Sequence, residues 1–255
     1  MSDFFLGVDL GGTKILSVVS NERGDIIERV KLDTEAELGS EKLIINNIIR
    51  SIEEVLDKSG LCSDDIVRIG IGSPGPLNTR EGIIYENSNL PWKNVPIVEI
   101  IEEQTGLPVF LENDANAAAL GEKWFGAGKD VQDMLYVTIS TGIGGGIIID
   151  GKVFHGINDI AGEVGHVVID PLGPVCGCGR KGCFEALASG TAISRMGKKA
   201  VKEGKDTLLR ELSDNNPELI DGKMIEDAAK KGDIFALEIW EQAGYYLGMG
   251  LTNLL

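Results

Sequence analysis

The sequence predicts an α/β protein of two domains with a cleft between them. Strand-like apolar segments alternate with amphipathic helical segments along all 255 residues, which is the pattern of α/β folds. An apolar strand, a Gly/Thr-rich turn and a second apolar strand occur at residues 4–20 and again at 135–149, which indicates two similar halves. We therefore place the domains at 1–115 and 116–255, and we expect a ligand in the cleft between them.

In the first half, β-branched runs predict strands and capping residues predict the helix ends. Ser40 is a typical N-cap, apolar residues follow it at helical spacing, and Gly60 is a natural stop, so a helix is predicted between them. The other predicted elements are strands at 4–9, 15–20, 26–31, 66–72 and 108–112, a rigid turn at 72–76, and helices at 97–105 and 115–124.

In the second half, the pattern of apolar strand, glycine-rich turn and apolar strand occurs again, and helical segments follow it. Strands are predicted at 135–139 and 147–149 around a glycine loop at 141–146. Helices are predicted at 191–203, 223–231 and 234–254. The last helical pattern runs to Leu254-Leu255 without a cap.

The composition narrows the classes of function. Lys and Arg number 24 against 40 Asp and Glu, a net charge of −16, and a chain this acidic repels nucleic acid and anionic membranes. We expect neither as a partner. No apolar run approaches a membrane span, and no basic segment precedes an apolar stretch at the N-terminus, so a cytoplasmic protein with reduced cysteines is predicted.

Two glycine loops follow predicted strands. In the first, Asp9-Leu10-Gly11-Gly12-Thr13-Lys14, glycines allow backbone N–H groups to approach a phosphate, Thr13 and Lys14 add a donor and a charge, and Asp9 could hold Mg²⁺ through water. An ordinary type I′ hairpin explains the same letters. The second loop, Ser140-Thr141-Gly142-Ile143-Gly144-Gly145-Gly146, has the same form, and two such loops together favour a phosphate clamp.

The segment Glu112-Asn113-Asp114-Ala115-Asn116-Ala117 joins a strand to an alanine-rich helix. One interpretation is structural, because Asn113 or Asp114 is a good N-cap for that helix. The functional interpretation makes Asp114 a general base that accepts a hydroxyl proton as the hydroxyl oxygen attacks phosphorus. The helix N-terminus would favour the ionised carboxylate.

A third pattern predicts a metal site. His166 and three cysteines, Cys176, Cys178 and Cys183, lie within 18 residues and are separated by glycines, which is typical of a Cys₃His zinc site. Four protein ligands leave no position for water, so the zinc is expected to be structural. Cys62 is predicted to be a buried apolar residue and His155 a turn residue.

Two carboxylates accompany this metal pattern. Glu163 precedes His166 in Glu-Val-Gly-His, and Glu185 follows Cys183. Carboxylates held by a metal-braced loop suit hydrogen bonds to adjacent sugar hydroxyls. For Glu185 an alternative is a favourable charge at a helix N-terminus.

Together these motifs resemble the ROK (repressor, open reading frame, kinase) family of sugar kinases, and especially its bacterial zinc-containing glucokinases. The resemblance covers essentially the whole chain. The matching strings are Gly-Val-Asp-Leu-Gly-Gly-Thr-Lys (7–14), Glu-Asn-Asp-Ala-Asn-Ala-Ala (112–118), Ser-Thr-Gly-Ile-Gly-Gly-Gly (140–146), Glu-Val-Gly-His (163–166) and Cys-Gly-Cys-Gly-x-x-Gly-Cys-x-Glu (176–185).

The resemblance implies an actin/hexokinase/Hsp70-like (ribonuclease H-like) ATPase fold, with a five-stranded mixed sheet in each domain. It implies ATP-dependent phosphorylation of a hexose, with Mg²⁺ and structural Zn²⁺, in a homodimer or homotetramer, and Asp114 as the catalytic base. The sugar ligands that it implies are Gly75, Asn89, Asn113, Asp114, Glu163, His166 and Glu185. The implied contacts to Mg²⁺ and the phosphates are Asp9, Gly11, Gly12, Thr13, Lys14, Thr141 and Gly142.

The sequence departs from the family pattern at its end. Family members continue into a further strand, a Gly-Gly adenosine loop and closing helices, so we expect a truncated chain that binds sugar better than nucleotide. Glucose is the expected substrate. Kinases for N-acetylglucosamine, N-acetylmannosamine, fructose or allose, and a non-catalytic sugar-binding fragment, remain alternatives. The repressor branch is disfavoured because Gly7 begins the first motif and leaves no room for a helix-turn-helix.

Overall fold

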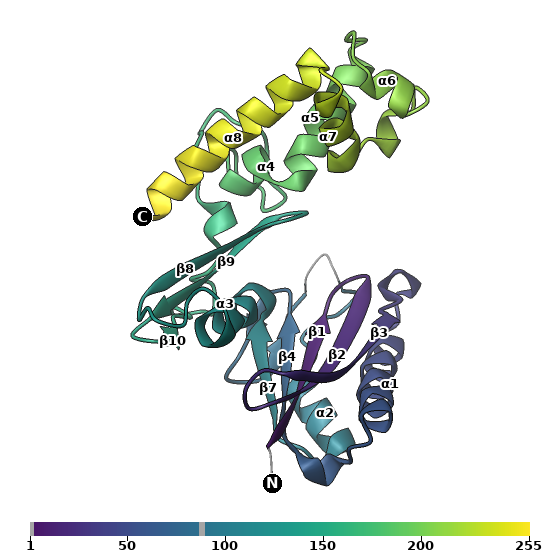
Figure 1. The fold of residues 1–255 in the computed structure, drawn as a ribbon, viewed down its shortest axis with the longest axis vertical. Coiled ribbons are helices and arrows are strands. Elements are labelled where there is room, and N and C mark those ends of the chain that lie inside the picture. Colours follow the sequence, from purple (N-terminus) through teal and green to yellow (C-terminus); the bar gives the residue numbers. More distant parts are fainter. Residues whose placement is uncertain (1–2, 87–89) are drawn as a thin grey trace. The chain divides into compact units, whose positions relative to one another are not determined.

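The structure is a computed structural model that describes residues 3–86 and 90–255 (Figure 1). The strands are β1 (Phe4–Leu10), β2 (Lys14–Asn21), β3 (Ile26–Asp33), β4 (Ile66–Ser73), β5 (Leu77–Asn78), β6 (Ile83–Ile84), β7 (Val109–Asn113), β8 (Met134–Ile139), β9 (Ile143–Ile149) and β10 (Lys152–Val153). The helices are α1 (Glu41–Ser59), α2 (Ile97–Thr105), α3 (Asp114–Phe125), α4 (Phe184–Ala188), α5 (Gly190–Lys202), α6 (Leu209–Leu212), α7 (Gly222–Lys230) and α8 (Ile234–Leu254).

By their contacts, the residues form two units. The first comprises Met1–Tyr136 and Gly146–Gly162, and the second comprises Val137–Gly145 and Glu163–Leu255. The α/β class that the sequence predicts is confirmed. The assignment of domains to 1–115 and 116–255 stays a prediction.

The first unit is built on a five-stranded mixed sheet in the order β3-β2-β1-β4-β7 (Figure 1). The strands β1, β4 and β7 run parallel, whereas β2 and β3 are antiparallel to their neighbours. Alternate residues of β1, such as Leu6 and Val8, are buried in one core with Ile48 and Ile52 of α1 and Ile101 of α2. This period-2 alternation is what a sheet covered by helices on one face requires.

The opposite face of the same strands is less covered. Gly7 and Asp9 of β1 and Gly70 of β4 are exposed, and α3 approaches this side at Gly72, whose added Cβ would lie 3.6 Å from the Ala117 side chain. Because β1, β4 and β7 are parallel, the loops after their carboxyl ends leave the same edge of the sheet.

The second unit is mainly helical. Apolar residues of α5, α7 and α8, including Ile193, Ile225 and Ile239, form its main core. A smaller core joins Ile143 of β9 to Phe184 of α4. The strands β8, β9 and β10, whose residues are divided between the two units, form a three-stranded sheet among the described residues, not the five-stranded sheet that the family resemblance implies. The Gly-, Pro- and Cys-rich segment 154–183 forms turns and isolated bridges and adds no strand to it.

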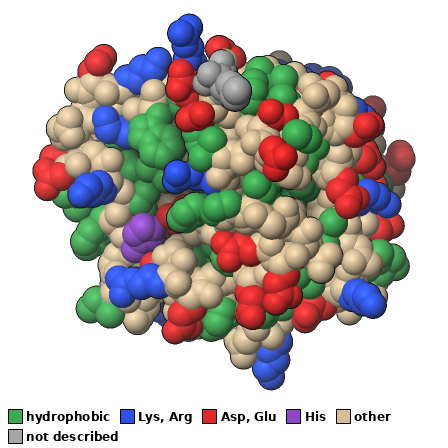
Figure 2. Space-filling model, turned by 90° about the horizontal axis from the view of Figure 1, so that it is seen from below, with side chains coloured by type: hydrophobic (Ala, Val, Ile, Leu, Met, Phe, Trp, Pro, Cys, Tyr) green, Lys and Arg blue, Asp and Glu red, His purple; other side chains and the backbone are tan. Residues whose placement is uncertain are grey.

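The surface carries the acidic excess of the composition. Figure 2 shows Asp and Glu side chains spread over the face in view, with Lys and Arg among them. No helix in the described part of the chain is both long enough and apolar enough to cross a membrane.

Candidate functional site

The first group of predicted site residues lies where parallel strands end. Asp9 near the end of β1 is in register with Gly72 of β4, and Gly72 is in register with Glu112 of β7. The ladder therefore brings the Asp9 loop and the Asn113-Asp114 pair to one edge of the sheet. They come from segments about a hundred residues apart in the sequence.

In the structure, the capping role belongs to Asn113, and the Asp114 side chain is not needed as the cap. Asn113 is the N-cap of α3, and its Oδ1 accepts hydrogen bonds from Ala115 N (3.0 Å) and Asn116 N (3.2 Å). Asp114 is the first helical residue, and its side chain is exposed, with Oδ1 accepting from Ala115 N at 2.8 Å. The cap is thus supplied by Asn113, and the Asp114 carboxylate is accessible at the N-terminus of α3.

The surroundings of Asp9 disfavour its negative charge, and a bound cation would offset this effect. Although Asp9 reaches the surface, the protein atoms around its carboxyl group displace part of its hydration and raise its pKa above the ordinary 3.8, and the negative charge of Asp114 raises it further. A carboxylate whose charge is disfavoured by a neighbouring carboxylate is stabilised when a divalent cation or a proton lies near it. Carboxylate oxygens are also the ligands that Mg²⁺ prefers.

The sequence analysis did not predict the contact between Glu112, the residue before Asn113, and His155. Glu112 Oε2 lies 2.7 Å from His155 Nε2, and its Oε1 accepts from Asn113 N and Asn116 Nδ2, both at 2.9 Å. His155, predicted as a turn residue, lies in the loop after β10 and contacts this strand end. Glu112 thereby fixes the backbone that carries the Asn113 cap. Its place inside the 112–117 motif was the one signal for this role.

Three other predicted residues fare differently. Gly75 lies in the turn after β4, at the same edge of the sheet, and is half-buried. Asn89 lies outside the described residues. Cys62, predicted to be buried, is exposed, because it stands at the start of a 3₁₀ turn, where its Sγ donates to Asp65 Oδ2 at 3.2 Å.

The second glycine loop belongs to the second unit. Thr141 and Gly142 lie between β8 and β9, and the Thr141 carbonyl accepts from Thr191 N (3.1 Å) and Thr191 Oγ1 (2.8 Å) at the start of α5. Glu185, in the first turn of α4, accepts from Ile143 N through Oε2 at 3.0 Å. Glu185 therefore anchors this loop, a function that the sequence interpretation did not assign to it.

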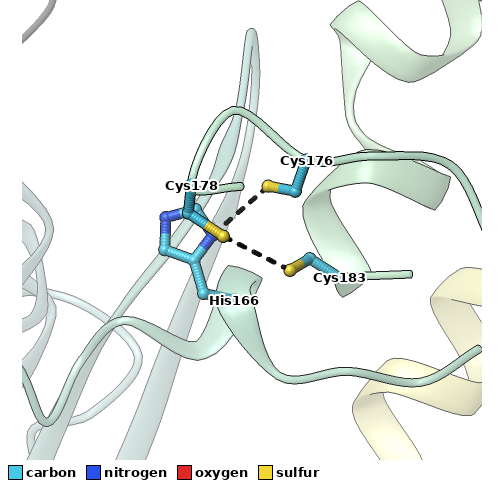
Figure 3. Close-up of side chains that lie close together, drawn as sticks. All are labelled: His166, Cys176, Cys178 and Cys183. Carbon is cyan, nitrogen blue, oxygen red and sulfur yellow. Dashed lines mark hydrogen bonds between the residues drawn. The ribbon is translucent and has the colours of Figure 1, made fainter. Parts of the chain in front are cut away.

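The metal-ligand prediction is matched by geometry. The ligand atoms of His166, Cys176, Cys178 and Cys183 all lie within 4.8 Å of one another (Figure 3). Cys176 Sγ is 3.6 Å from His166 Nδ1, and Cys178 Sγ is 3.6 Å from Cys183 Sγ. Around a tetrahedral zinc with Zn–S bonds of about 2.3 Å and Zn–N bonds of about 2.0 Å, these separations would be about 3.5 Å and about 3.8 Å. The cysteines are free, so no disulfide competes for them.

The surroundings of the cluster also fit a metal. His166 turns Nδ1 toward Cys176, while its Nε2 lies 3.8 Å from Glu163 Oε2. A carboxylate beside the distal nitrogen is the usual arrangement for a metal-bound histidine. Burial raises the pKa of the Cys183 thiol to about 12, whereas hydrogen bonds from Arg180 lower that of Cys178 to about 6. A cation is what lets all three sulfur atoms carry charge together.

Comparison with known proteins assigns the family. Residues 5–255 match the family described as ROK family. The chain belongs to the ROK family. Among curated relatives in the family, it is 44% identical over 235 residues to the glucokinase of Thermotoga maritima (92% of this chain, 72% of that one). It is 39% identical over 256 residues to the glucokinase of Halalkalibacterium halodurans (100% of this chain, 77% of that one).

Structures of the ROK family agree with the fold. The ROK family glucokinase from Streptomyces griseus, solved in complex with glucose and AMPPNP, matches with a TM-score of 0.81 and 36% identity, covering 98% of this chain and 78% of that one. A regulatory ROK relative also matches. The xylose repressor of Caldicellulosiruptor bescii is 38% identical over 254 residues, covering 98% of this chain and 62% of that protein.

Proposed function

We propose that this protein is an ATP-dependent hexose kinase that converts glucose to glucose 6-phosphate. The observation that carries the proposal is the accessible Asp114 carboxylate, at a helix N-terminus and at the same strand edge as the Asp9 glycine loop. The similarity of the chain to ROK glucokinases, one of which was solved with glucose and AMPPNP, supports glucose and ATP as the substrates.

In the proposed reaction, Asp114 accepts the proton of the sugar 6-hydroxyl as its oxygen forms a bond to the γ-phosphorus of ATP. The bond from that phosphorus to the β–γ bridging oxygen breaks, and ADP leaves with the electron pair. An exposed carboxylate in the first turn of α3 is accessible to a sugar hydroxyl, which suits this role. Further sugar contacts are proposed for Gly75, Asn89, Asn113, Glu163, His166 and Glu185.

The phosphates and their cation are assigned to the glycine loops. Gly11, Gly12, Thr13 and Lys14 of the first loop and Thr141 and Gly142 of the second are the proposed phosphate contacts. Asp9 is the proposed Mg²⁺ ligand, held through water. The raised pKa of Asp9 supports this assignment, because a bound cation would offset the repulsion from Asp114.

We also propose a structural zinc held by His166, Cys176, Cys178 and Cys183. Bound there, Zn²⁺ supplies a rigid cross-link and no reacting group, because the four side chains fill its coordination. His166 Nδ1 faces the cluster, so its Nε2 is the atom left for Glu163 or a sugar hydroxyl. A cytoplasmic location and a homodimeric or homotetrameric state belong to the same proposal.

One assay tests both the identity of the sugar substrate and the ability of the chain to turn it over. Coupled ADP release is measured with glucose, N-acetylglucosamine, N-acetylmannosamine, fructose and allose, beside sugar binding by calorimetry. Glucose should give the highest kcat/KM. A higher value for another sugar would correct the substrate, and binding without ADP release would make the chain a sugar-binding protein.

The decisive variant is Asp114→Asn. The amide keeps the shape of the side chain but cannot take a proton, so kcat should fall by about 100-fold or more while glucose affinity changes little. Asp221→Asn is the control, because it makes the same change at another helix N-terminus. Asp221 is the N-cap of α7, and the amide of the variant can still accept from Met224 N. Retention of more than about a tenth of the activity by Asp114→Asn would remove Asp114 from the role of base.

A further inference from the structure

One buried threonine contacts the first glycine loop at two points. Thr34, the residue after β3, is fully buried, and its Oγ1 donates to the Gly11 carbonyl at 2.7 Å. Its backbone N–H donates to the Thr13 carbonyl at 2.9 Å. Thr34 therefore holds the carbonyl groups on both sides of Gly12.

The hydroxyl contact determines the direction of the Gly11–Gly12 peptide. In a planar trans peptide, the C=O and N–H groups point in opposite directions. Because Thr34 draws the Gly11 carbonyl toward the protein, the N–H of Gly12 points away from Thr34. A phosphate is attracted by that N–H and would be repelled by the carbonyl in its place.

A peptide between two glycines is the one that most needs such a lock. Neither residue has a Cβ, so a half-turn of the peptide meets little steric resistance. The flipped peptide would present the Gly11 carbonyl oxygen to a phosphate. The hydroxyl of Thr34 stabilises the unflipped orientation through a hydrogen bond that the flipped one cannot make.

Thr34 is itself held in place by a second buried side chain. Asn47 of α1, 3% exposed, donates from Nδ2 to Glu35 Oε2 at 2.9 Å and lies 3.4 Å from the carbonyl oxygens of Asp33 and Thr34. Glu35 has a left-handed backbone with φ 59°, which is rare for a residue with a side chain. The segment that follows β3 is thus held in place by the Asn47 side chain of α1.

We infer that Thr34 is a positioning residue for nucleotide binding, and that its hydroxyl holds the Gly11–Gly12 peptide in the orientation that presents the Gly12 N–H to a phosphate. This inference rests on the proposed function, in which the first loop contacts ATP. Thr34 touches no substrate and acts through the loop peptide. The predicted consequence is specific to the nucleotide, because no sugar contact is assigned to this loop.

The test removes the hydroxyl alone. Thr34→Val keeps the shape of the side chain and the N–H bond to Thr13, so only the lock on Gly11 is lost. The apparent affinity for nucleotide is proportional to the fraction of molecules whose Gly11–Gly12 peptide is in the competent orientation. Loss of one hydrogen bond of about 1 kcal/mol lowers that fraction, so KM for Mg-ATP and Kd for Mg-AMPPNP should rise about fivefold. KM for glucose should stay within about twofold, and Thr34→Ser should restore nucleotide affinity.

Ser51→Ala is the matched control. Ser51 of α1 is also fully buried, and its hydroxyl bonds Ser17 Oγ at 2.7 Å in the same unit without contacting the loop. Both variants should lower the temperature of unfolding, but only Thr34→Val should weaken nucleotide binding. Equal nucleotide affinity in the two variants, or a glucose KM that rises as much as the ATP KM, would overturn the inference.

The experiment also separates this inference from the proposed function. If the wild-type protein releases ADP with glucose and Thr34→Val binds nucleotide as Ser51→Ala does, only the inference fails. If the wild-type protein binds Mg-AMPPNP without turnover, the proposed reaction fails, and the titrations still decide the role of Thr34. If it binds no nucleotide, both fail.

Discussion

Gly182→Ala should damage the metal loop far more than Gly177→Ala, although both glycines lie within the same cysteine motif. Gly182 is buried with φ 70°, and a Cβ built on it would lie 1.5 Å from the Asp170 carbonyl oxygen. Gly177 is exposed, and an added Cβ meets nothing within 4 Å. The pair therefore isolates the close approach of two loops beside Cys183.

The magnitude follows from two costs. Alanine in the left-handed region costs about 1–2 kcal/mol. Relief of the collision requires the loops to separate by roughly 1.5 Å, since Cβ contacts under 3.0 Å essentially do not occur. That movement breaks the bonds from Ile169 N (2.9 Å) and Asp170 N (3.2 Å) to the Gly182 carbonyl, at about 1 kcal/mol each. The total is about 3–4 kcal/mol of unfolding free energy.

The assay combines thermal unfolding with elemental analysis. For a chain of this size, the loss corresponds to a melting temperature lower by on the order of 10 °C. Gly182→Ala should also hold less than one zinc per chain, because the displaced loop carries Cys183. Gly177→Ala should resemble the wild type in both measurements. A Gly182→Ala protein that melts within about 2 °C of Gly177→Ala and retains its metal would refute the reasoning.

Two further predictions concern Asp9 and the cysteines. Because the folded state raises the pKa of Asp9 above 3.8, its ionisation costs stability as pH rises through and above that value. In Mg²⁺-free buffer, Asp9→Asn should therefore melt higher than the wild type at pH 7, with the difference shrinking toward pH 3, and an Asp9→Asn protein less stable at pH 7 would contradict this. Cys183→Ser should lose zinc and weaken glucose binding, while Cys62→Ser, which changes an exposed thiol outside the cluster, should keep both. Elemental analysis that finds no zinc in the purified wild-type protein would end the zinc proposal.

Long, strongly patterned elements could be predicted from the sequence. The predicted helices at 97–105 and 234–254 have the same bounds in the structure. The signals for α1 were also correct, since the Ser40 side chain accepts from Leu43 N and Gly60 closes the helix with φ 72°. Each of these helices has apolar residues at helical spacing and a capping signal at one end or both, so local information suffices.

Short elements and distant contacts escaped prediction for physical reasons. The two-residue strands β5, β6 and β10 and the five-residue α4 are too short to show a period. The metal cluster was recognisable because its cysteines lie within eight residues, whereas Glu112 and His155 are 43 apart, and Thr34 and Gly11 are 23 apart. Such pairs are brought together by the sheet and its loops, which no local pattern encodes. The prediction that Cys62 is buried was wrong, because a cysteine's apolar character does not reveal that it begins an exposed turn.

The cap of α3 has a consequence for the polarity of sugar recognition. Both acceptor sites of Asn113 Oδ1 are used by Ala115 N and Asn116 N, so the amide has only N–H bonds left to offer. A sugar hydroxyl that meets Asn113 must therefore accept there and point its own hydrogen elsewhere. In the proposed site, the neighbouring carboxylate of Asp114 can receive that hydrogen. A deoxyfluoro sugar keeps a weak acceptor and loses the hydrogen, so it would separate the two halves of this contact.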